Sequence, residues 1–360
     1  MDFLLQDLKK LGDYMHKFDL KSMDIKELEN LLISNGEKAF RAKQLFKFIH
    51  DEKGDRIENL TTFSKDLRSK LDEISYISDL KIIKRLDSNL DNTKKYIYEL
   101  EDKNIIESVY LESFANNTIC ISSQVGCKMG CEFCASTKNG FTRNLRVSEM
   151  LDQIYMCEKD LNKKIDNIVL MGIGEPLDNF LNVSKFIRIL NNDLGHNTGI
   201  RNITVSTCGI IEGINKFTEE NIKANLAISL HNGIQKEREK IMPISKMNKL
   251  PELKKALINY QEKLSRRLSF EYIVIKGVND TFDHARAVKN MADGLDVHIN
   301  LIPINKIDGY SYPETTFEDA ERFKEKLDNL NLNTTIRRKQ GEDIDASCGQ
   351  LRNNYLKKRP

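Results

Sequence analysis

The first 85 residues show the apolar spacing of amphipathic helices. One stretch places apolar residues at i, i+3, i+4 and i+7, which is a single helical face: Ala42, Leu45, Phe46 and Ile49. Lysines and arginines fall mostly on the other face. A basic face of this kind either is solvated above a core or contacts a nucleic acid. We therefore predict a small helical domain over residues 1–85, and treat it as a candidate for RNA contact.

From residue 86 onward the pattern changes to short β-rich runs. Runs 95–100 and 105–111, joined by a turn at 101–104, predict a β-hairpin that precedes the main fold. Six further runs are separated by helical patterns: 118–123, 167–172, 201–206, 225–229, 268–275 and 297–302. Strands that alternate with helices predict an α/β domain over 86–360 with parallel strands. Six strands of this kind suit a partial (β/α)6 barrel or an open sheet, and periodicity does not choose between them.

Composition and charge narrow the class of protein. The chain has 360 residues, 40% of them apolar, with 56 Lys and Arg against 54 Asp and Glu, which gives a net charge of +2. This size favours one large and one small domain. No apolar stretch approaches the roughly 18 residues of a membrane span, and the N-terminus lacks the pattern of a secretory leader. We expect a cytoplasmic protein without a membrane partner, whose seven cysteines do not form a disulfide framework.

The sharpest chemical signal is a cysteine triplet. Cys127, Cys131 and Cys134 form a C-x3-C-x2-C run that includes Gly130 and follows Gly126. Three thiolates on a tight loop can hold three irons of a 4Fe-4S cluster and leave the fourth iron open to a small molecule. The alternative is a structural zinc site, which usually takes four ligands in paired spacings, and no second pair of that kind is present.

The triplet resembles the radical S-adenosylmethionine (SAM) superfamily, in which a three-cysteine loop follows the first strand of a barrel. Further strings narrow the resemblance to RlmN, the adenine-C2 methyltransferases of 23S rRNA and tRNA. They occur in order along the chain: CISSQVGC at 120–127, MGIGEPL at 171–177, SLH at 229–231 and DIDASCGQL at 343–351. The resemblance implies a radical SAM barrel, one 4Fe-4S cluster and two molecules of SAM per turnover.

The resemblance also implies three catalytic residues. Cys348 matches the cysteine that takes a methyl group from one SAM molecule, and the resulting S-methyl carbon becomes a radical that adds to C2 of adenine. Glu107 matches the base that removes the C2 proton. Cys120 matches the thiol that attacks the sulfur of Cys348, which releases RNA and leaves a disulfide. Taken singly, each cysteine would more often be a small buried residue, and Glu107 a solvated carboxylate.

Residues at the ends of the predicted strands are the expected contacts of SAM. By resemblance these are Gly174, Glu175, Ser206, Ser229, Leu230, His231 and Asn305. The carboxyl ends of barrel strands are where such sites are built. Cys157 and Cys208 match no role and are expected to be structural.

Two alternatives to this function remain at the level of sequence. The Cfr group methylates C8 of the same rRNA adenosine, but Pro176 and the approach RRKQGED at 337–343 look more like the C2 enzymes. A non-catalytic, zinc-bearing RNA-binding protein is the alternative from another class. The expected partners are 23S rRNA, tRNA and a reductant such as flavodoxin, and the expected state is a monomer. Ser347 departs from the alanine that these enzymes generally carry, and Arg337, Arg338, Lys339 and the tail 357–359 are candidate phosphate contacts.

Overall fold

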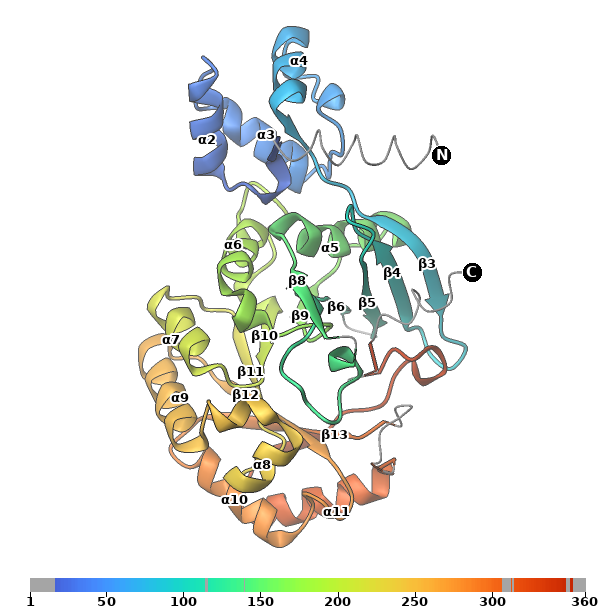
Figure 1. The fold of residues 1–360 in the computed structure, drawn as a ribbon, viewed down its shortest axis with the longest axis vertical. Coiled ribbons are helices and arrows are strands. Elements are labelled where there is room, and N and C mark those ends of the chain that lie inside the picture. The colour runs from blue at the N-terminus through green and yellow to red at the C-terminus, as the bar shows by residue number, and fades with distance from the viewer. Residues whose placement is uncertain are drawn as a thin grey trace.

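The computed structural model describes residues 17–113, 116–138, 140–305, 312, 314–347, 350 and 351. Cys348, the basic tail at 357–359 and the first sixteen residues lie outside the described residues. A helical N-terminal unit sits at one end of a large sheet, and most of the remaining helices line the outer side of that sheet (Figure 1).

From residue 17 onward, the N-terminal unit contains three α-helices, two short 3-10 helices and two very short strands. The helices are α2 (Ile25–Ser34), α3 (Arg41–His50) and α4 (Lys65–Ile74), and the strands β1 (Phe18–Asp19) and β2 (Ser75–Tyr76) pair in parallel. The four apolar residues that predict α3 are all buried, so this helix is confirmed.

Helix α2 begins at a complete capping box. Asp24 accepts the backbone N–H of Glu27 at 2.9 Å, and the Glu27 carboxylate accepts the backbone N–H of Asp24 at 2.8 Å. A cap of this kind stabilises a helix by ~1 kcal/mol.

A ten-stranded sheet forms the body of the protein. Its strands lie in the order β14-β13-β12-β11-β10-β9-β6-β5-β4-β3, and every pairing from β6 to β14 is parallel. The parallel strands are β6 (Asn117–Cys120), β9 (Asn167–Leu170), β10 (Ile203–Thr207), β11 (Asn225–Ser229), β12 (Leu268–Val274), β13 (Val297–Pro303) and β14 (Thr334–Ile336). The first six of these correspond to the six predicted runs, and the sheet is a partial barrel.

Helices follow most of the parallel strands, as the alternating pattern predicts. They are α5 (Val147–Leu161), α6 (Phe180–Asn191), α7 (Ile211–Glu219), α8 (Gln235–Ile241), α9 (Leu250–Leu264), α10 (Phe282–Ala292) and α11 (Phe317–Asp328). None of the helices in the described part of the chain has the length and apolar character needed to cross a lipid bilayer.

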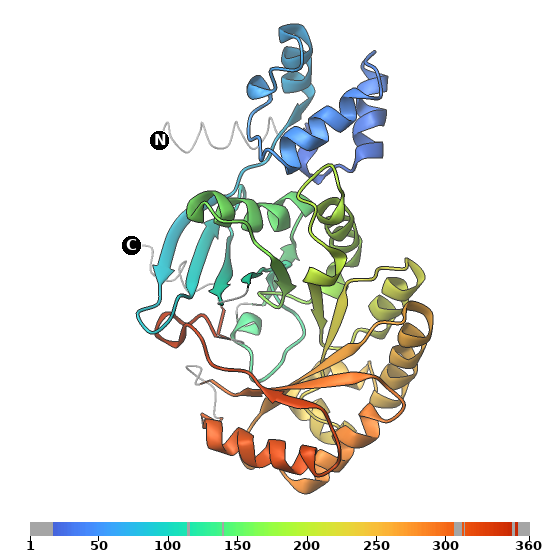
Figure 2. The same cartoon turned by 180° about the vertical axis from the view of Figure 1, so that it is seen from behind.

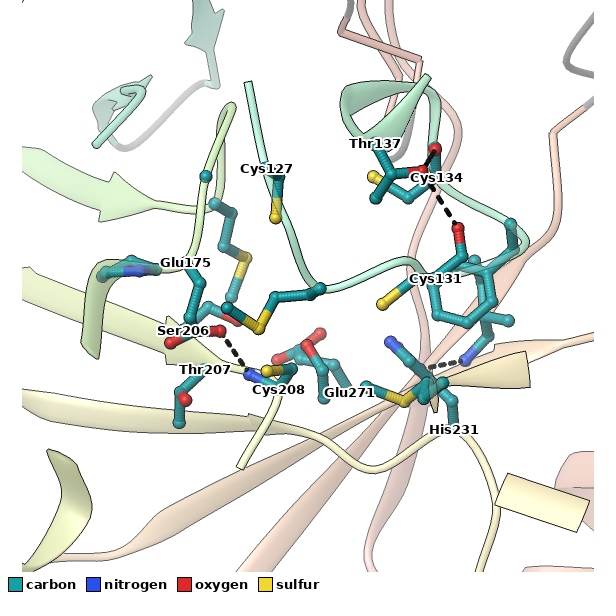
Figure 3. A pocket seen from close by; sticks show the side chains of 18 of the residues that line it. Cys127, Cys131, Cys134, Thr137, Glu175, Ser206, Thr207, Cys208, His231 and Glu271 are labelled. Carbon is teal, nitrogen blue, oxygen red and sulfur yellow. Dashed lines mark hydrogen bonds between the residues drawn. The ribbon is translucent and has the colours of Figure 1, made fainter. Parts of the chain in front are cut away.

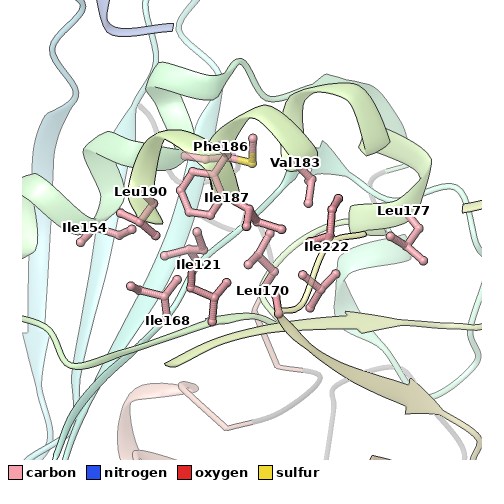
Figure 4. Close-up of a cluster of buried hydrophobic side chains, with 14 of the residues drawn as sticks. Ile121, Ile154, Ile168, Leu170, Leu177, Val183, Phe186, Ile187, Leu190 and Ile222 are labelled. Carbon is pink, nitrogen blue, oxygen red and sulfur yellow. The ribbon is translucent and has the colours of Figure 1, made fainter. Parts of the chain in front are cut away.

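The main core lies between the sheet and these helices. Figure 4 shows Ile168 and Leu170 of β9 facing Phe186, Ile187 and other side chains of α6, and all of them are almost completely buried. Parallel strands covered on both faces have continuous apolar sequences, which explains the β-rich runs. Truncating Phe186 to Ala is expected to cost about 3–5 kcal/mol of stability.

The predicted hairpin is present and is one strand larger than expected. β4 (Lys94–Glu99) pairs with β5 (Ile105–Glu112), and β5 continues antiparallel onto β6. β3 (Lys81–Asp87) also pairs with β4, so the predicted boundary at residue 85 falls inside a strand, and residues 81–85 are not helical. As an edge strand with few buried positions, β3 lacks the apolar signal of the central strands. The turn-rich segment 88–93 is the tip of the β3–β4 hairpin.

The first predicted parallel strand ends earlier than expected. It stops at Cys120, and the chain then leaves the sheet for the antiparallel ribbon of β7 (Gln124–Gly126) and β8 (Phe141–Asn144). The buried side-chain amide of Gln153 bonds the backbone of Ser122 where strand pairing has ended. It accepts the N–H of Ser122 at 2.8 Å and donates to the C=O of Ser122 at 3.0 Å. This departure carries the chain into the cysteine loop.

Candidate functional site

The three cysteines lie on the loop between β7 and β8. Gly126 and Gly130 both have a φ of +74°, and a Cβ on Gly126 would lie 1.8 Å from the carbonyl oxygen of Gly140. Only glycine adopts this turn with so close a backbone approach. The N–H of Cys127 donates to the same Gly140 oxygen at 3.1 Å. The glycines therefore allow the loop to fold back on itself around the thiols.

The thiols of Cys127, Cys131 and Cys134 line a cavity of about 150 Å³ at the carboxyl ends of the parallel strands (Figure 3). Burial raises the pKa of Cys127 to about 12 and that of Cys131 well above its usual value. These thiols are therefore protonated at neutral pH unless a metal stabilises the thiolates.

Five of the seven predicted cofactor contacts line the same cavity: Gly174, Glu175, Ser206, Ser229 and His231. The other two do not. Alternate residues at a strand end face opposite sides, so the side chain of Leu230 points away from the cavity and is completely buried. The N–H of Leu230 donates to the Glu271 carbonyl at 3.0 Å. Asn305, two residues beyond the end of β13, lines a second cavity instead.

Glu175 is a buried carboxylate at the end of β9 with both oxygens in use. One oxygen accepts the N–H of Leu177 at 3.0 Å and the other that of Cys208 at 2.7 Å. Burial raises the pKa of Glu175, and these two hydrogen bonds lower it less strongly. A cationic ligand in the cavity would stabilise the ionised form, so the site suits an ammonium group.

His231 is held neutral at the wall of the cavity. Burial lowers its pKa to about 3, and its Nδ1 accepts the N–H of Ile273 at 3.0 Å. The proton is therefore on Nε2. The ring also meets Phe133 of the cysteine loop edge-on, with 4.7 Å between ring centroids. His231 thus supports the loop and contributes a neutral ring to the cavity.

The sequence prediction missed two charged residues at this site. Glu271, buried on β12, lines the cavity; the signal for it is a lone carboxylate in a largely apolar strand. Arg238 of α8 is completely buried and donates to the carbonyls of Leu230, Cys208 and Ser229 at 2.9, 2.7 and 3.0 Å. It ties the ends of β10 and β11 together beneath the cavity. Its segment QKEREKI resembles a solvated helix, so no local signal reveals it.

A second cavity of about 760 Å³ adjoins the first, and Ile302 lines both. Its lining comes mainly from the segment after β14 and from the hairpin tip. It contains three basic residues, Arg337, Arg338 and Lys339, and two acidic ones, Asp91 and Glu342, and we call it the basic cavity. Lys339 forms ion pairs with Glu314 and Glu342. Arg337 forms an ion pair at 3.2 Å with Glu271, so a single pair of charges links the two cavities.

Two of the three predicted catalytic residues, Glu107 and Cys120, lie near the C-terminal segment that lines part of this second cavity. Glu107 on β5 is buried and forms an ion pair with Lys95 at 3.0 Å. Cys120, at the end of β6, packs in a small cluster with Val109 and Ala346. Ala346 precedes Cys348 by two residues, so the described part of the C-terminal segment brings its polar loop to Cys120.

Comparison with known proteins agrees with this arrangement. Residues 18–77 match the family of ribosomal RNA large subunit methyltransferase N-terminal domains, and residues 121–287 match the radical SAM superfamily. A protein of Caldanaerobacter subterraneus described as a probable dual-specificity RNA methyltransferase RlmN is 47% identical over 94% of this chain and 99% of its own. A Finegoldia magna protein of the same description is 45% identical over 96% and 99%.

This chain belongs to the RlmN family. A crystal structure of a radical SAM methyltransferase from Sphaerobacter thermophilus matches it with a TM-score of 0.87 and 32% identity, over 93% of this chain and 99% of that one. The recognised family and the radical SAM fold are therefore confirmed.

Membership in the RlmN family and the radical SAM superfamily implies a 4Fe-4S cluster and SAM. The residues present fit both groups. Two buried thiols and the partly buried thiol of Cys134 open onto one cavity, and the residues beside them include a buried carboxylate suited to an ammonium group. Cys127, Cys131 and Cys134 would hold the cluster, and Glu175 with its neighbours would face SAM.

Proposed function

We propose that this chain methylates C2 of adenosine in 23S rRNA and in tRNA. The observation that carries this proposal is the pairing of two adjoining cavities, one lined by the three cysteines and the other by basic residues, linked by Glu271 and Arg337. The names of the relatives, dual-specificity RNA methyltransferases that align over nearly their full length, support both the reaction class and the two RNA substrates.

The cofactors supply chemistry that amino-acid side chains lack. When bound, two molecules of SAM per turnover and a cluster held by Cys127, Cys131 and Cys134 would supply a methyl group and a hydrogen-abstracting radical. The protein positions these groups and excludes water. Gly174, Glu175, Ser206, Ser229 and His231 do so from the strand ends, and Asn305 from the side of the larger cavity. Leu230 supports them indirectly, because its backbone bonds to Glu271 and Arg238 hold the strand ends together.

Three residues of the chain act on the methyl group and the adenine. Cys348 accepts the methyl group, because a thiolate is a strong and polarisable nucleophile. Glu107 accepts the proton from C2. The thiolate of Cys120 then attacks the sulfur of Cys348, so that a disulfide forms, the bond from sulfur to the RNA-linked carbon breaks, and that carbon takes a proton to become the methyl group. The contact of Cys120 with Ala346 supports this pairing of cysteines. A reductant such as flavodoxin is the electron donor, and the disulfide left between the two cysteines is reduced again to thiols. The enzyme acts as a monomer, and its RNA substrates imply action in the cytoplasm.

The direct test is nucleoside mass spectrometry of RNA treated with the reconstituted enzyme. Protein reconstituted without oxygen should contain about four irons and four sulfides per chain. With labelled SAM and a reductant it should produce labelled 2-methyladenosine in 23S rRNA and tRNA. Cys348→Ala should produce none. 8-Methyladenosine would assign the chain Cfr-type chemistry, and zinc in place of iron with no methylation would indicate an RNA-binding protein without catalysis; either result contradicts the proposal.

A further inference from the structure

Lys95 on β4 is a buried cation at the junction of the β-hairpin and the C-terminal segment. Its side chain is only 7% exposed, and its Nζ lies 3.0 Å from the Oε2 of Glu107, whose side chain is 3% exposed. The same Nζ donates to the backbone carbonyl of Asp345 at 3.1 Å. Lys95 therefore touches both the carboxylate of Glu107 and the loop that continues to Cys348.

The loop that Lys95 contacts is held by the tip of the β3–β4 hairpin. The carboxylate of Asp343 accepts the hydroxyl of Ser88 and the N–H of Asn89, each at 2.7 Å. The N–H of Gly341 donates to Asp91 at 2.9 Å. Figure 2 shows the C-terminal segment beside this hairpin tip. These bonds fix the loop to the hairpin, but they do not involve Glu107.

A buried lysine and a buried carboxylate are each unfavourable alone, and together they stabilise one another's charged forms. A purely structural interpretation is that the ion pair only holds β4 against β5. The hydrogen bond from Lys95 to Asp345 indicates a further role, because backbone pairing already joins β4 and β5 along their length.

We propose that Lys95 is a positioning residue that keeps Glu107 ionised and orients it towards the segment carrying Cys348. This inference rests on the proposed function, in which Glu107 accepts the C2 proton of adenine. Without the ammonium group, the carboxylate loses this buried ion pair and its orientation, so it accepts that proton less readily. RNA joined to Cys348 would then persist as a covalent adduct, while the earlier steps continue.

The experiment compares covalent protein–RNA adducts on denaturing gels for anaerobically reconstituted Lys95→Met, Lys95→Arg, Glu107→Gln and the Lys95→Met/Glu107→Gln double variant. Glu107→Gln and Lys95→Met should each raise the adduct fraction at least about tenfold over the wild type, as expected for impaired general-base catalysis. The double variant should match Glu107→Gln, because Lys95 acts through Glu107. Lys95→Arg retains the charge and should release free methylated RNA. Iron content, SAM cleavage and thermal melting report whether each variant is folded.

Asp343→Ala is the matched control, since it loosens the same loop without removing a contact of Glu107. It should lower adduct formation and methylation together, with no adduct accumulation. If Lys95→Met behaves like Asp343→Ala, or if the double variant is additive, Lys95 only docks the loop and the inference is wrong. If Glu107→Gln itself fails to accumulate adduct, the role of Glu107 in the proposed function fails, and the inference fails with it.

If the Lys95→Met protein does not fold, the Lys95→Arg variant decides the question. Adduct accumulation in a folded Lys95→Arg protein contradicts the proposal, and free product supports it.

Discussion

The two adjoining cavities of this protein differ in size, lining and origin in the sequence. The cysteine-lined cavity is about 150 Å³ and is built from one loop and the ends of consecutive strands. The basic cavity is about 760 Å³ and is assembled from the hairpin tip, the end of β13 and the segment after β14. A small cavity lined by thiols suits a cluster and its cofactor, whereas a larger cavity with several basic residues suits a nucleic acid. We therefore expect that substitutions can alter the binding of SAM and the binding of RNA separately.

The largest expected effect is the loss of the cluster in Cys131→Ala. Two thiols cannot hold a cubane in place of three, so iron, sulfide and brown colour should fall to background, and SAM cleavage should stop. RNA affinity, measured by filter binding, should be unchanged because the basic cavity is intact. Retention of a full complement of iron in this variant would refute the assignment of the cluster ligands.

Glu175→Gln should weaken the binding of SAM without affecting RNA. Removing a buried charge from a ligand contact costs about 1.5–3 kcal/mol, or roughly 10- to 150-fold in affinity. Equilibrium dialysis of labelled SAM against cluster-loaded protein measures this loss. A normal SAM affinity, or an equal loss of RNA affinity, would show that the two cavities are not separable at this residue.

His50 lies away from both cavities and should affect stability alone. Burial lowers its pKa to about 3, so the unfolded state binds a proton that the folded state does not between pH 3 and the usual pKa of 6.5. Its contribution to stability is present above pH 6.5 and is lost as pH falls. Lowering the pH from 7 to 5 should destabilise the wild type by up to about 2 kcal/mol relative to His50→Gln.

Denaturant unfolding of the two proteins at both pH values measures this difference. The comparison must be between variants, because burial raises the pKa of Asp152 to about 7 and makes the opposite contribution over the same range. An identical stability difference at pH 5 and pH 7 would mean that His50 is protonated in the folded state. Binding of SAM and RNA at pH 7 should be unchanged in His50→Gln.

The smallest expected effect is that of Arg338→Ala at the basic cavity. Loss of one phosphate contact should weaken RNA binding a few-fold and reduce the slope of log affinity against log salt by about 0.7–0.9. SAM affinity should be unchanged. An unaltered salt slope would place Arg338 outside the RNA interface.

The small cavity could largely be predicted because its parts are local in sequence. The cysteine run, its glycines and the strand-end serines lie next to apolar strands that periodicity locates. Leu230 and Asn305 were placed less well, since the direction in which a strand-end side chain faces depends on where the strand stops. Glu271 was missed although a lone carboxylate in a largely apolar strand is a signal, and Arg238 was missed because a charged residue in a short polar helix carries no sign of burial.

The second cavity depends on contacts between distant segments. Lys95 and Asp345 are 250 residues apart, and Glu271 and Arg337 are 66 apart. No spacing rule connects such pairs, so the sequence revealed the catalytic candidates only through resemblance to a family. The edge strand β3 was missed for a related reason, because its half-exposed face gives it little apolar periodicity.

The central claim is that the two cavities act on one RNA through Cys348 and Cys120, and Cys120→Ala tests it most directly. Anaerobic turnover of this variant with 23S rRNA or tRNA should leave a covalent protein–RNA adduct, and mass spectrometry should locate the linkage on the peptide that contains Cys348. Cys348→Ala should give no adduct. Free methylated RNA from Cys120→Ala at the wild-type rate, or an adduct in Cys348→Ala, would contradict the account.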